Sequence, residues 1–389
     1  MRRLLAVCAA TIVLALPCQA QQGEAPLRIF GYFQNAFSYQ NSSRGEVITS
    51  FSAQQLNLFL QKDLAEDFTA FVNFEVVNGY SSSDGWGSWG LEEAWVRYRW
   101  DRRLNLKLGL HIPTFNRLND IKNRTPLLPY IIRPIVYESS FDEFLSNDEY
   151  TPARGSFSLY GFFPAGRAKL DYSAFIGNSP NIRRFTDPFS TVETQGQSGV
   201  DTTRALQLGG RLAVRTTEAT LGVSGTHERT NQFVGAERFY GGDIDDYKLA
   251  TRYRLGADLY IERGRWTAEA ELIWVRYPNR PVPLESDLTF VYGVLGYNVT
   301  DRLFVFGTVS QNWETITQIQ PRGAFSVPIE ITVGGGGAAY TLTDRVVFKA
   351  QYAHARLDYG RATSSGISGF PQVSDNFTDF FSVAMSVVF

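Results

Sequence analysis

The sequence predicts an all-β protein, a transmembrane antiparallel β-barrel of about sixteen strands. Three observations predict it. Apolar and polar residues alternate with a period of two, short turns alternate with long polar connections, and the last alternating stretch ends on the terminal Phe389. Residues that face lipid and residues that face the lumen alternate along every strand of a membrane barrel, and its connections are short on one rim and long on the other.

The alternation extends over spans that suit a membrane. Leu104, Leu106, Leu108 and Leu110 alternate with polar or small residues, and the stretch 265–276 alternates in the same way. A soluble β-sandwich also alternates, which keeps a secreted all-β protein as an alternative. Its strands are usually about 5–6 residues long, whereas these spans are about as long as a tilted strand that crosses a bilayer.

The turns set the number of strands. Short turns rich in Asp, Thr and Gly lie at 64–68, 101–103, 164–166, 215–218, 263–264, 299–303 and 342–346. Asp and Thr favour tight turns because their side chains bond nearby backbone groups. Seven such turns join seven strand pairs, and one further strand lies at each terminus. We expect the strands near 28–40, 51–62, 68–78, 91–100, 103–112, 153–163, 167–178, 203–214, 219–229, 248–262, 265–276, 287–299, 302–314, 329–342, 345–358 and 377–389.

The N-terminus predicts export. Arg2 and Arg3 precede an apolar run, and small residues precede a cleavage point ahead of Gln21, so residues 1–20 are predicted to be a signal peptide and 21–389 the barrel. Cys18 would be the acylated residue of a lipoprotein signal, but Pro17 occupies a position that requires a small residue. The predicted location is the outer membrane of a Gram-negative type of cell, with its lipid as a partner.

Composition excludes several kinds of site. Both cysteines, Cys8 and Cys18, lie in the signal peptide, so no disulfide or cysteine metal site is expected in the mature chain. The net charge of −2 gives no reason to expect nucleic acid as a partner. We predict no cofactor, no metal site and no enzymatic activity, because the three histidines are far apart and no serine has a recognisable hydrolase context. The pattern G-x-G-x-x-G at 85–90 precedes a predicted strand, whereas a dinucleotide site needs a helix there.

The longest connection, 113–150, follows the fifth predicted strand. It contains four prolines and apolar side chains that include Phe115, Ile131, Ile132 and Val136. A loop wholly exposed to water would not need these side chains, so we expect the connection to fold inward against the wall. Loops of this length in compact proteins are usually functional.

These features together resemble the general bacterial porins. The strand count, the terminal Phe389 and the long connection after the fifth strand carry the resemblance. It implies that the third external loop narrows a channel, and that the protein is a homotrimer. Residues 91–96 and 108–113 look more like the phosphate-selective-porin-like branch. That branch is marked by an arginine ladder and a lysine cluster, whereas this chain has only six lysines and its basic residues are interleaved with acids, which argues against phosphate specificity.

Charged side chains in the lumen would set selectivity. Opposed charges across a narrow point would create a transverse field, and the alternative for any single residue is an ion pair that holds the loop against the wall. The pore-lining candidates are Arg97, Arg99, Lys107, Lys169, Arg211, Arg252, Arg254, Lys349, Glu93, Glu269 and Glu271, with Glu75, Asp171 and Asp258 as further inward acids. The constriction-loop candidates are Arg117, Asp120, Lys122, Arg124, Arg133, Glu138, Asp142 and Glu143, with Asp148 and Glu149 beyond them.

The sequence therefore leaves two alternative functions open. The first is a porin-like channel for the passive diffusion of small hydrophilic solutes or ions. The second is a closed binding or structural barrel, such as an adhesin, a lipid transporter or an assembly subunit, in which 113–150 is a plug. Sequence alone does not distinguish them, because a loop that narrows the bore and a loop that fills it have the same composition.

Overall fold

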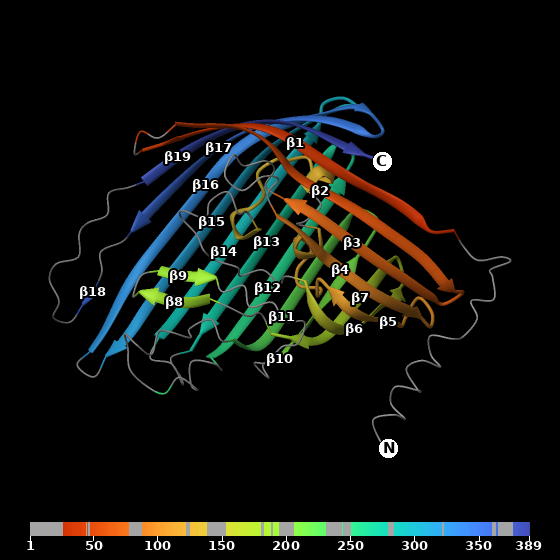
Figure 1. Cartoon of the computed structure of the whole chain (residues 1–389), viewed down its shortest axis with the longest axis horizontal. Helices are drawn as coiled ribbons and strands as arrows, with labels where there is room; N and C mark the ends of the chain where they lie inside the picture. The colour runs from red at the N-terminus through yellow and green to blue at the C-terminus, as the bar shows by residue number, and fades with distance from the viewer. Residues whose placement is uncertain are drawn as a thin grey trace, which may run out of the picture.

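The strands form one closed wall (Figure 1). The computed structural model describes residues 26–43, 45, 47–77, 88–121, 125–137, 153–179, 183–187, 190–193, 206–230, 243, 250–278, 284–320, 323–359, 363–364 and 376–389. The wall strands are β1 (Arg28–Ser42), β2 (Val47–Ala65), β3 (Phe68–Val77), β4 (Ser88–Arg99), β5 (Asn105–His111), β6 (Arg154–Ala165), β7 (Ala168–Asn178), β10 (Leu206–Arg215), β11 (Ala219–Thr230), β12 (Ala250–Arg263), β13 (Trp266–Tyr277), β14 (Leu284–Asn298), β15 (Leu303–Gln320), β16 (Gly323–Thr343), β17 (Val346–Tyr359) and β19 (Asn376–Val388).

Every neighbouring pair in this wall is antiparallel, and the described wall strands number sixteen, as predicted. Two further pieces lie beside them. β18 (Thr363–Ser364) pairs with the end of β16, and β8 (Arg183–Asp187) pairs with β9 (Ser190–Glu193) in a separate sheet. The predicted signal peptide, 1–20, lies outside the described residues.

The first and last strands close the barrel. β1 pairs with β2 on one side and with β19 on the other, with Phe33 opposite Val387. The backbones of Gly31 and Phe389 exchange two hydrogen bonds of 3.0 Å. A Cβ at Gly31 would lie 2.8 Å from the Phe389 ring, so glycine lets the terminal aromatic pack against the seam. Closure pairs strand edges that an open sheet would leave free.

The short turns form as predicted, at all seven places. The side chain of Asp101 accepts hydrogen bonds from the backbone N–H groups of Arg103 and Leu104 at 2.6 and 2.9 Å. Thr300 accepts in the same way from Arg302 and Leu303. These bonds satisfy backbone groups that a two-residue reversal leaves unpaired.

The outer face of the wall is apolar and exposed. Leu108, Leu221 and Val223 are 64%, 59% and 57% exposed, and similar side chains continue around the barrel. An exposed apolar belt of this extent is stable only where lipid or another apolar surface covers it. Helical structure is limited to the 3₁₀ turns η1 (Leu118–Asp120), η2 (Thr125–Leu127) and η3 (Ile135–Tyr137), and in the described part of the chain no helix could cross a membrane.

The inner face has two sectors of different chemistry. The apolar sector lies on β13–β17 and β19, and its inward side chains are Ile273, Val275, Leu288, Phe290, Val294, Phe306, Ile331, Val333, Ala353, Ala355, Leu357 and Phe380. The polar sector lies on β3–β7, and its inward side chains include Thr69, Asn73, Glu93, Arg97, Lys107, Ser156 and Ser158. Alternation thus persists on both sides, but only the sector on β13–β17 and β19 has large apolar side chains along much of its inner face.

Candidate pore constriction

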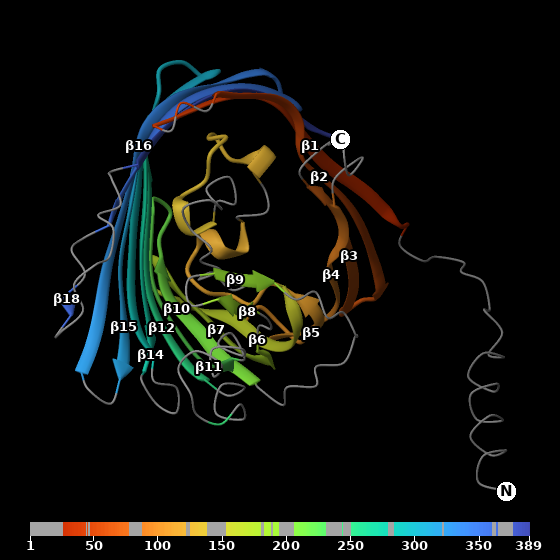
Figure 2. The same cartoon turned by 60° about the vertical axis from the view of Figure 1, so that its left-hand side comes forward.

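The connection between β5 and β6 turns into the barrel (Figure 2). Its described residues, 112–121 and 125–137, are referred to below as the inserted segment. Phe115 and Leu118 are completely buried, and Ile131 is 1% exposed. The inward fold that the apolar residues of this connection predict is therefore the arrangement of its described part.

The inserted segment packs on the apolar sector. Phe115, Leu118, Tyr130, Ile135 and Val136 belong to the same buried cluster as the side chains of β13–β17. Each large aliphatic or aromatic side chain that leaves water in this way contributes about 1.5–3 kcal/mol. An apolar patch inside a water-filled barrel would be unfavourable, so the two surfaces stabilise each other.

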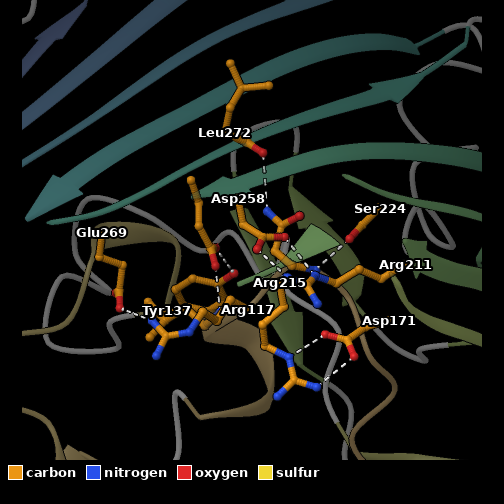
Figure 3. A network of polar contacts seen from close by, with 12 residues as sticks. Arg117, Tyr137, Asp171, Arg211, Arg215, Ser224, Asp258, Glu269 and Leu272 are labelled. Atoms are coloured by element: carbon orange, nitrogen blue, oxygen red, sulfur yellow. Dashed lines mark hydrogen bonds and ion pairs between the residues drawn. The ribbon is translucent and has the colours of Figure 1, made fainter. Parts of the chain in front are cut away.

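Two carboxylates of β13 anchor the segment (Figure 3). Arg117 donates to Glu269 at 2.7 Å and lies over the Tyr260 ring at 3.6 Å. Glu271 accepts from the Leu118 backbone N–H at 2.6 Å and from the Tyr137 hydroxyl at 3.0 Å. Each carboxylate thus accepts hydrogen bonds from the inserted segment. Only 4% of the surface of Glu271 is exposed, because the segment covers it.

Tyr130 adds a further bond to Glu269, at 3.4 Å. Burial raises the pKa of the Tyr130 hydroxyl well above its ordinary value, and the carboxylates of Glu269 and Glu271 raise it further. The hydroxyl therefore stays protonated at neutral pH and can donate to a carboxylate that is largely removed from water.

Asn116 fits into the wall at β11 and β12. It has a positive φ of 50°, its N–H donates to Ser224 at 2.9 Å, and its side chain donates to the Leu272 carbonyl at 3.3 Å. A Cβ at Gly256 would lie 2.1 Å from the Asn116 side-chain oxygen. Glycine at this strand position makes the close approach possible, and asparagine is one of the few residues that tolerate the left-handed conformation.

A third anchor lies on β17. The side-chain oxygen of Gln351 accepts from the N–H groups of Ile131 and Ile132 at 2.7 and 2.8 Å. The Lys349 ammonium donates to the Pro126 carbonyl at 3.1 Å and to Gln34 at 2.8 Å. Gln54 of β2 also donates to the Ile131 carbonyl at 3.4 Å, so the segment is fixed at several separate points from β11 round to β2.

The fold is similar to those of several solved outer-membrane proteins. The chain is similar to an anion-selective porin from Comamonas acidovorans, with a TM-score of 0.59 and 13% identity over 94% of this chain and 99% of that one. The outer membrane channel DcaP of Acinetobacter baumannii matches with a TM-score of 0.58 and 10% identity over 95% and 99%. OmpT of Vibrio cholerae matches with a TM-score of 0.57 and 10% identity over 95% and 99%.

This chain has the fold of a sixteen-stranded outer-membrane porin. No protein-family model matches the sequence, and neither does any curated protein. Identities this low extend to the fold alone, so the roles of individual residues in this porin-like barrel rest on its own geometry.

Several predicted pore-lining residues are ion-paired along the inner face of β6 and β10–β12. Arg211 forms two bonds to Asp258, and Arg252 and Arg254 both approach Glu228. Arg154 lies 3.8 Å from the same carboxylate. Arg154, Arg252 and Arg254 share the single negative charge of Glu228, and Arg211 pairs with Asp258, so in this porin-like barrel all four arginines are held by carboxylates within the wall.

Other predicted pore-lining residues face the bore on the polar sector. Arg97 lies directly opposite Lys107 in the β4–β5 register, and it bonds Thr69 at 3.1 Å. The Lys107 ammonium lies over the Trp95 ring at 4.8 Å. Arg99 and Lys169 are exposed, Glu75 bonds Gln55, Glu93 accepts from Trp95, and Asp171 pairs with Arg215 at 2.7 Å (Figure 3). None of the contacts of the inserted segment described above involves β3, β4 or β7.

The predicted charges of the constriction loop divide in two. Arg117 forms the ion pair that was the alternative to a free pore-facing charge, Asp120 lies in η1, and Arg133 is half-buried in the segment. Lys122, Arg124, Glu138, Asp142 and Glu143 lie outside the described residues.

Sequence reasoning missed several residues that hold the segment. Tyr130, Tyr137, Asn116 and Gln351 are ordinary polar residues whose partners are more than 100 positions away in the chain. One local signal was available. After Glu269 and Glu271, the inward positions of β13 continue as Ile273, Val275 and Tyr277, which marks a wall that must be covered.

Proposed function

We propose that this protein is an outer-membrane channel for the passive diffusion of small hydrophilic solutes or ions, in which the inserted segment narrows the bore. The observation that carries the proposal is that the described contacts of this segment run from β11 round to β2 and do not extend to the charged side chains of β4 and β7. Its contacts join it to the apolar sector and the neighbouring strands, whereas charged side chains of the polar sector, among them Arg99 and Lys169, are exposed.

Physical considerations support a channel. A barrel of sixteen strands is wide enough to leave an aqueous lumen, whereas about eight strands leave room only for side chains. Inward charges on the polar sector would favour solutes that keep their hydration and would discriminate among ions. The charged residues of the polar sector are therefore the proposed pore lining, and Arg117, Asp120 and Arg133 belong to the proposed constriction.

We further propose where the channel lies and how it is oriented in the membrane. Residues 1–20 direct export, the exposed apolar belt lies in the outer membrane, and the short turns face the periplasm as in bacterial barrels. We also propose a homotrimer. One solved structure of similar fold, OmpT of Vibrio cholerae, is described as a trimer form, and it matches with a TM-score of 0.57 and 10% identity.

Reconstitution into a planar lipid bilayer tests the proposal. Folded protein should insert in discrete steps, each with a current that is linear in voltage. Folding is verified independently by the change in electrophoretic mobility between heated and unheated samples. If protein that passes this check gives no steps at micromolar concentration or below, the channel proposal is wrong.

The closed barrel is the second candidate, because the inserted segment has several anchors on the wall. Replacing residues 125–137 with a short glycine-serine linker separates the two functions. A rise from almost no conductance to a large one indicates a plug, whereas a modest rise above an already open state indicates a constriction.

A further inference from the structure

A group of exposed cations lies on the short-turn rim beneath the polar sector. Arg99 ends β4, Arg102 and Arg103 lie in the turn before β5, and Arg167 and Lys169 lie at the turn that begins β7. All five side chains belong to exposed residues. They are called the cationic mouth patch below.

The two turns that carry the patch are held side by side. The Phe162 N–H donates to the Arg102 carbonyl at 3.2 Å, and the Tyr172 hydroxyl donates to the Arg103 carbonyl at 2.5 Å. Both bonds cross from one turn to the strands of the other, so the cations are gathered on a fixed part of the rim.

The same sign of charge continues inward from the patch. Arg97 and Lys107 are cross-strand neighbours on the inner face, and Arg97 lies two residues before Arg99 on β4. Like charges directly opposite each other on a sheet are destabilising. Here the bond from Arg97 to Thr69 and the contact of Lys107 with the Trp95 ring hold the two charges side by side.

The acids nearest in sequence are engaged elsewhere. Asp101 accepts two backbone hydrogen bonds within its own turn, and Asp171 holds Arg215 in a two-pronged ion pair at 2.7 and 2.8 Å. No member of the patch forms an ion pair with any other described residue.

The rest of the rim differs. Arg263 lies 3.6 Å from Glu218, Arg28 lies 2.7 Å from Asp63, and Arg265 donates to the Val299 carbonyl. Two of these three arginines are ion-paired, and Arg302 and Arg345 each follow an aspartate. The β2–β3 turn beside Arg99 carries the exposed acids Glu66 and Asp67, so the excess of cations lies on the β4–β5 and β6–β7 turns. A one-sided excess of charge at the mouth of a low-dielectric channel focuses the field and raises the local concentration of the opposite ion.

We propose that the cationic mouth patch is an anion-recruiting site, and that it gives the channel a preference for small inorganic or carboxylate anions. This inference rests on the proposed channel function and adds its solute class. We assign the preference to the short-turn mouth, because the arginines of β12 are buried and bonded to Glu228, whereas the cations of the patch are exposed to solvent.

The test measures the reversal potential across a bilayer in a tenfold gradient of potassium chloride. The wild-type channel should pass chloride more readily than potassium. The triple variant R99Q/R103Q/K169Q should lower the chloride-to-potassium permeability ratio by roughly two-fold or more, since local counter-ion enrichment scales with the charge that focuses it. The difference should shrink in concentrated salt, where the Debye length is only about 3 Å at 1 M.

Two matched variants make the result specific. R99K/R103K keeps the charge and should keep the preference. R302Q/R345Q removes two exposed arginines from the turns β14–β15 and β16–β17, and should leave the ratio unchanged. If the triple variant conducts with an unaltered reversal potential, or if the wild type prefers potassium, the anion proposal is wrong while the channel stands. Absence of conductance from folded wild-type protein would instead overturn the channel itself.

Discussion

The apolar and polar sectors of the inner wall are built from strands of the same kind, yet they differ in what they contact. On the apolar sector, Val275 and Leu288 are almost completely buried because the inserted segment covers them. On the polar sector, Arg99 remains exposed and Lys107 rests on an aromatic ring. The difference shows that one side of the bore is constructed to bind a loop and the other to present charge.

The largest effect is expected from a charge placed in the apolar sector. Leu288→Asp would bury a carboxylate beneath the inserted segment, opposite Val275 and Glu314 and with no cation directly across from it, at a cost of about 3 kcal/mol or more. We expect the segment to detach, which protease cleavage within 113–137 of the folded barrel would reveal. The matched control is Asn73→Asp on the polar sector, where the new carboxylate can still accept the 3.0 Å bond from Asn57. If both variants resisted protease cleavage within 113–137 equally, the proposed difference between the two sectors would be contradicted.

Loss of the Glu271 carboxylate should have the next largest effect. Glu271→Ala leaves the Leu118 N–H and the Tyr137 hydroxyl without their acceptor, and two unsatisfied buried donors cost about 2–4 kcal/mol together. Single-channel recordings should show larger current fluctuations, because the segment is held less firmly. Glu271→Gln retains one acceptor oxygen and should lie between Ala and the wild type. Quiet recordings from Glu271→Ala would show that this anchor is dispensable.

A single methyl group tests the close approach at β12. Gly256→Ala would bring its Cβ to within 2.1 Å of the Asn116 side chain and should destabilise the docked segment by about 1–3 kcal/mol. Gly225→Ala is the control, since the nearest side-chain atom to its Cβ would be 3.6 Å away. Protection of backbone amides in 113–121 from hydrogen exchange should fall in the first variant only.

The smallest effect is expected at Arg117. Its ion pair with Glu269 is partly open to water, with side-chain exposures of 31% and 11%, and the contact with the Tyr260 ring adds to it. Arg117→Ala should weaken docking by about 1 kcal/mol. The variant should also change the unit conductance, and this difference from the wild type should decrease as salt is raised. Arg117→Lys should restore part of the wild-type conductance. A salt-independent change would indicate lost packing rather than lost charge.

Much of the wall could be predicted from the sequence because its causes are local. Alternation and turn chemistry act over a few residues, so the strand between Leu104 and Leu110 and the turns at Thr300 and Asp101 were identifiable without the fold. The inward fold of the described part of the long connection, 112–121 and 125–137, was also predictable, from apolar residues in a loop. The partners of that loop were not, because Gln351 and Glu271 come close to it only when the barrel closes.

The charged residues also divide into what the sequence predicts and what only the fold decides. The sequence identifies Arg252, Arg254, Arg99 and Lys169 alike as inward candidates, because a period of two says only which face a side chain takes. The tertiary structure separates them, since the first two are buried against Glu228, whereas the last two are exposed and form no ion pair with a described acid. By itself the sequence determined a sixteen-stranded barrel with a loop that folds inward. Which charges stay available to a solute was decided only by the pairing of distant strands, because compensation requires contact across the sheet.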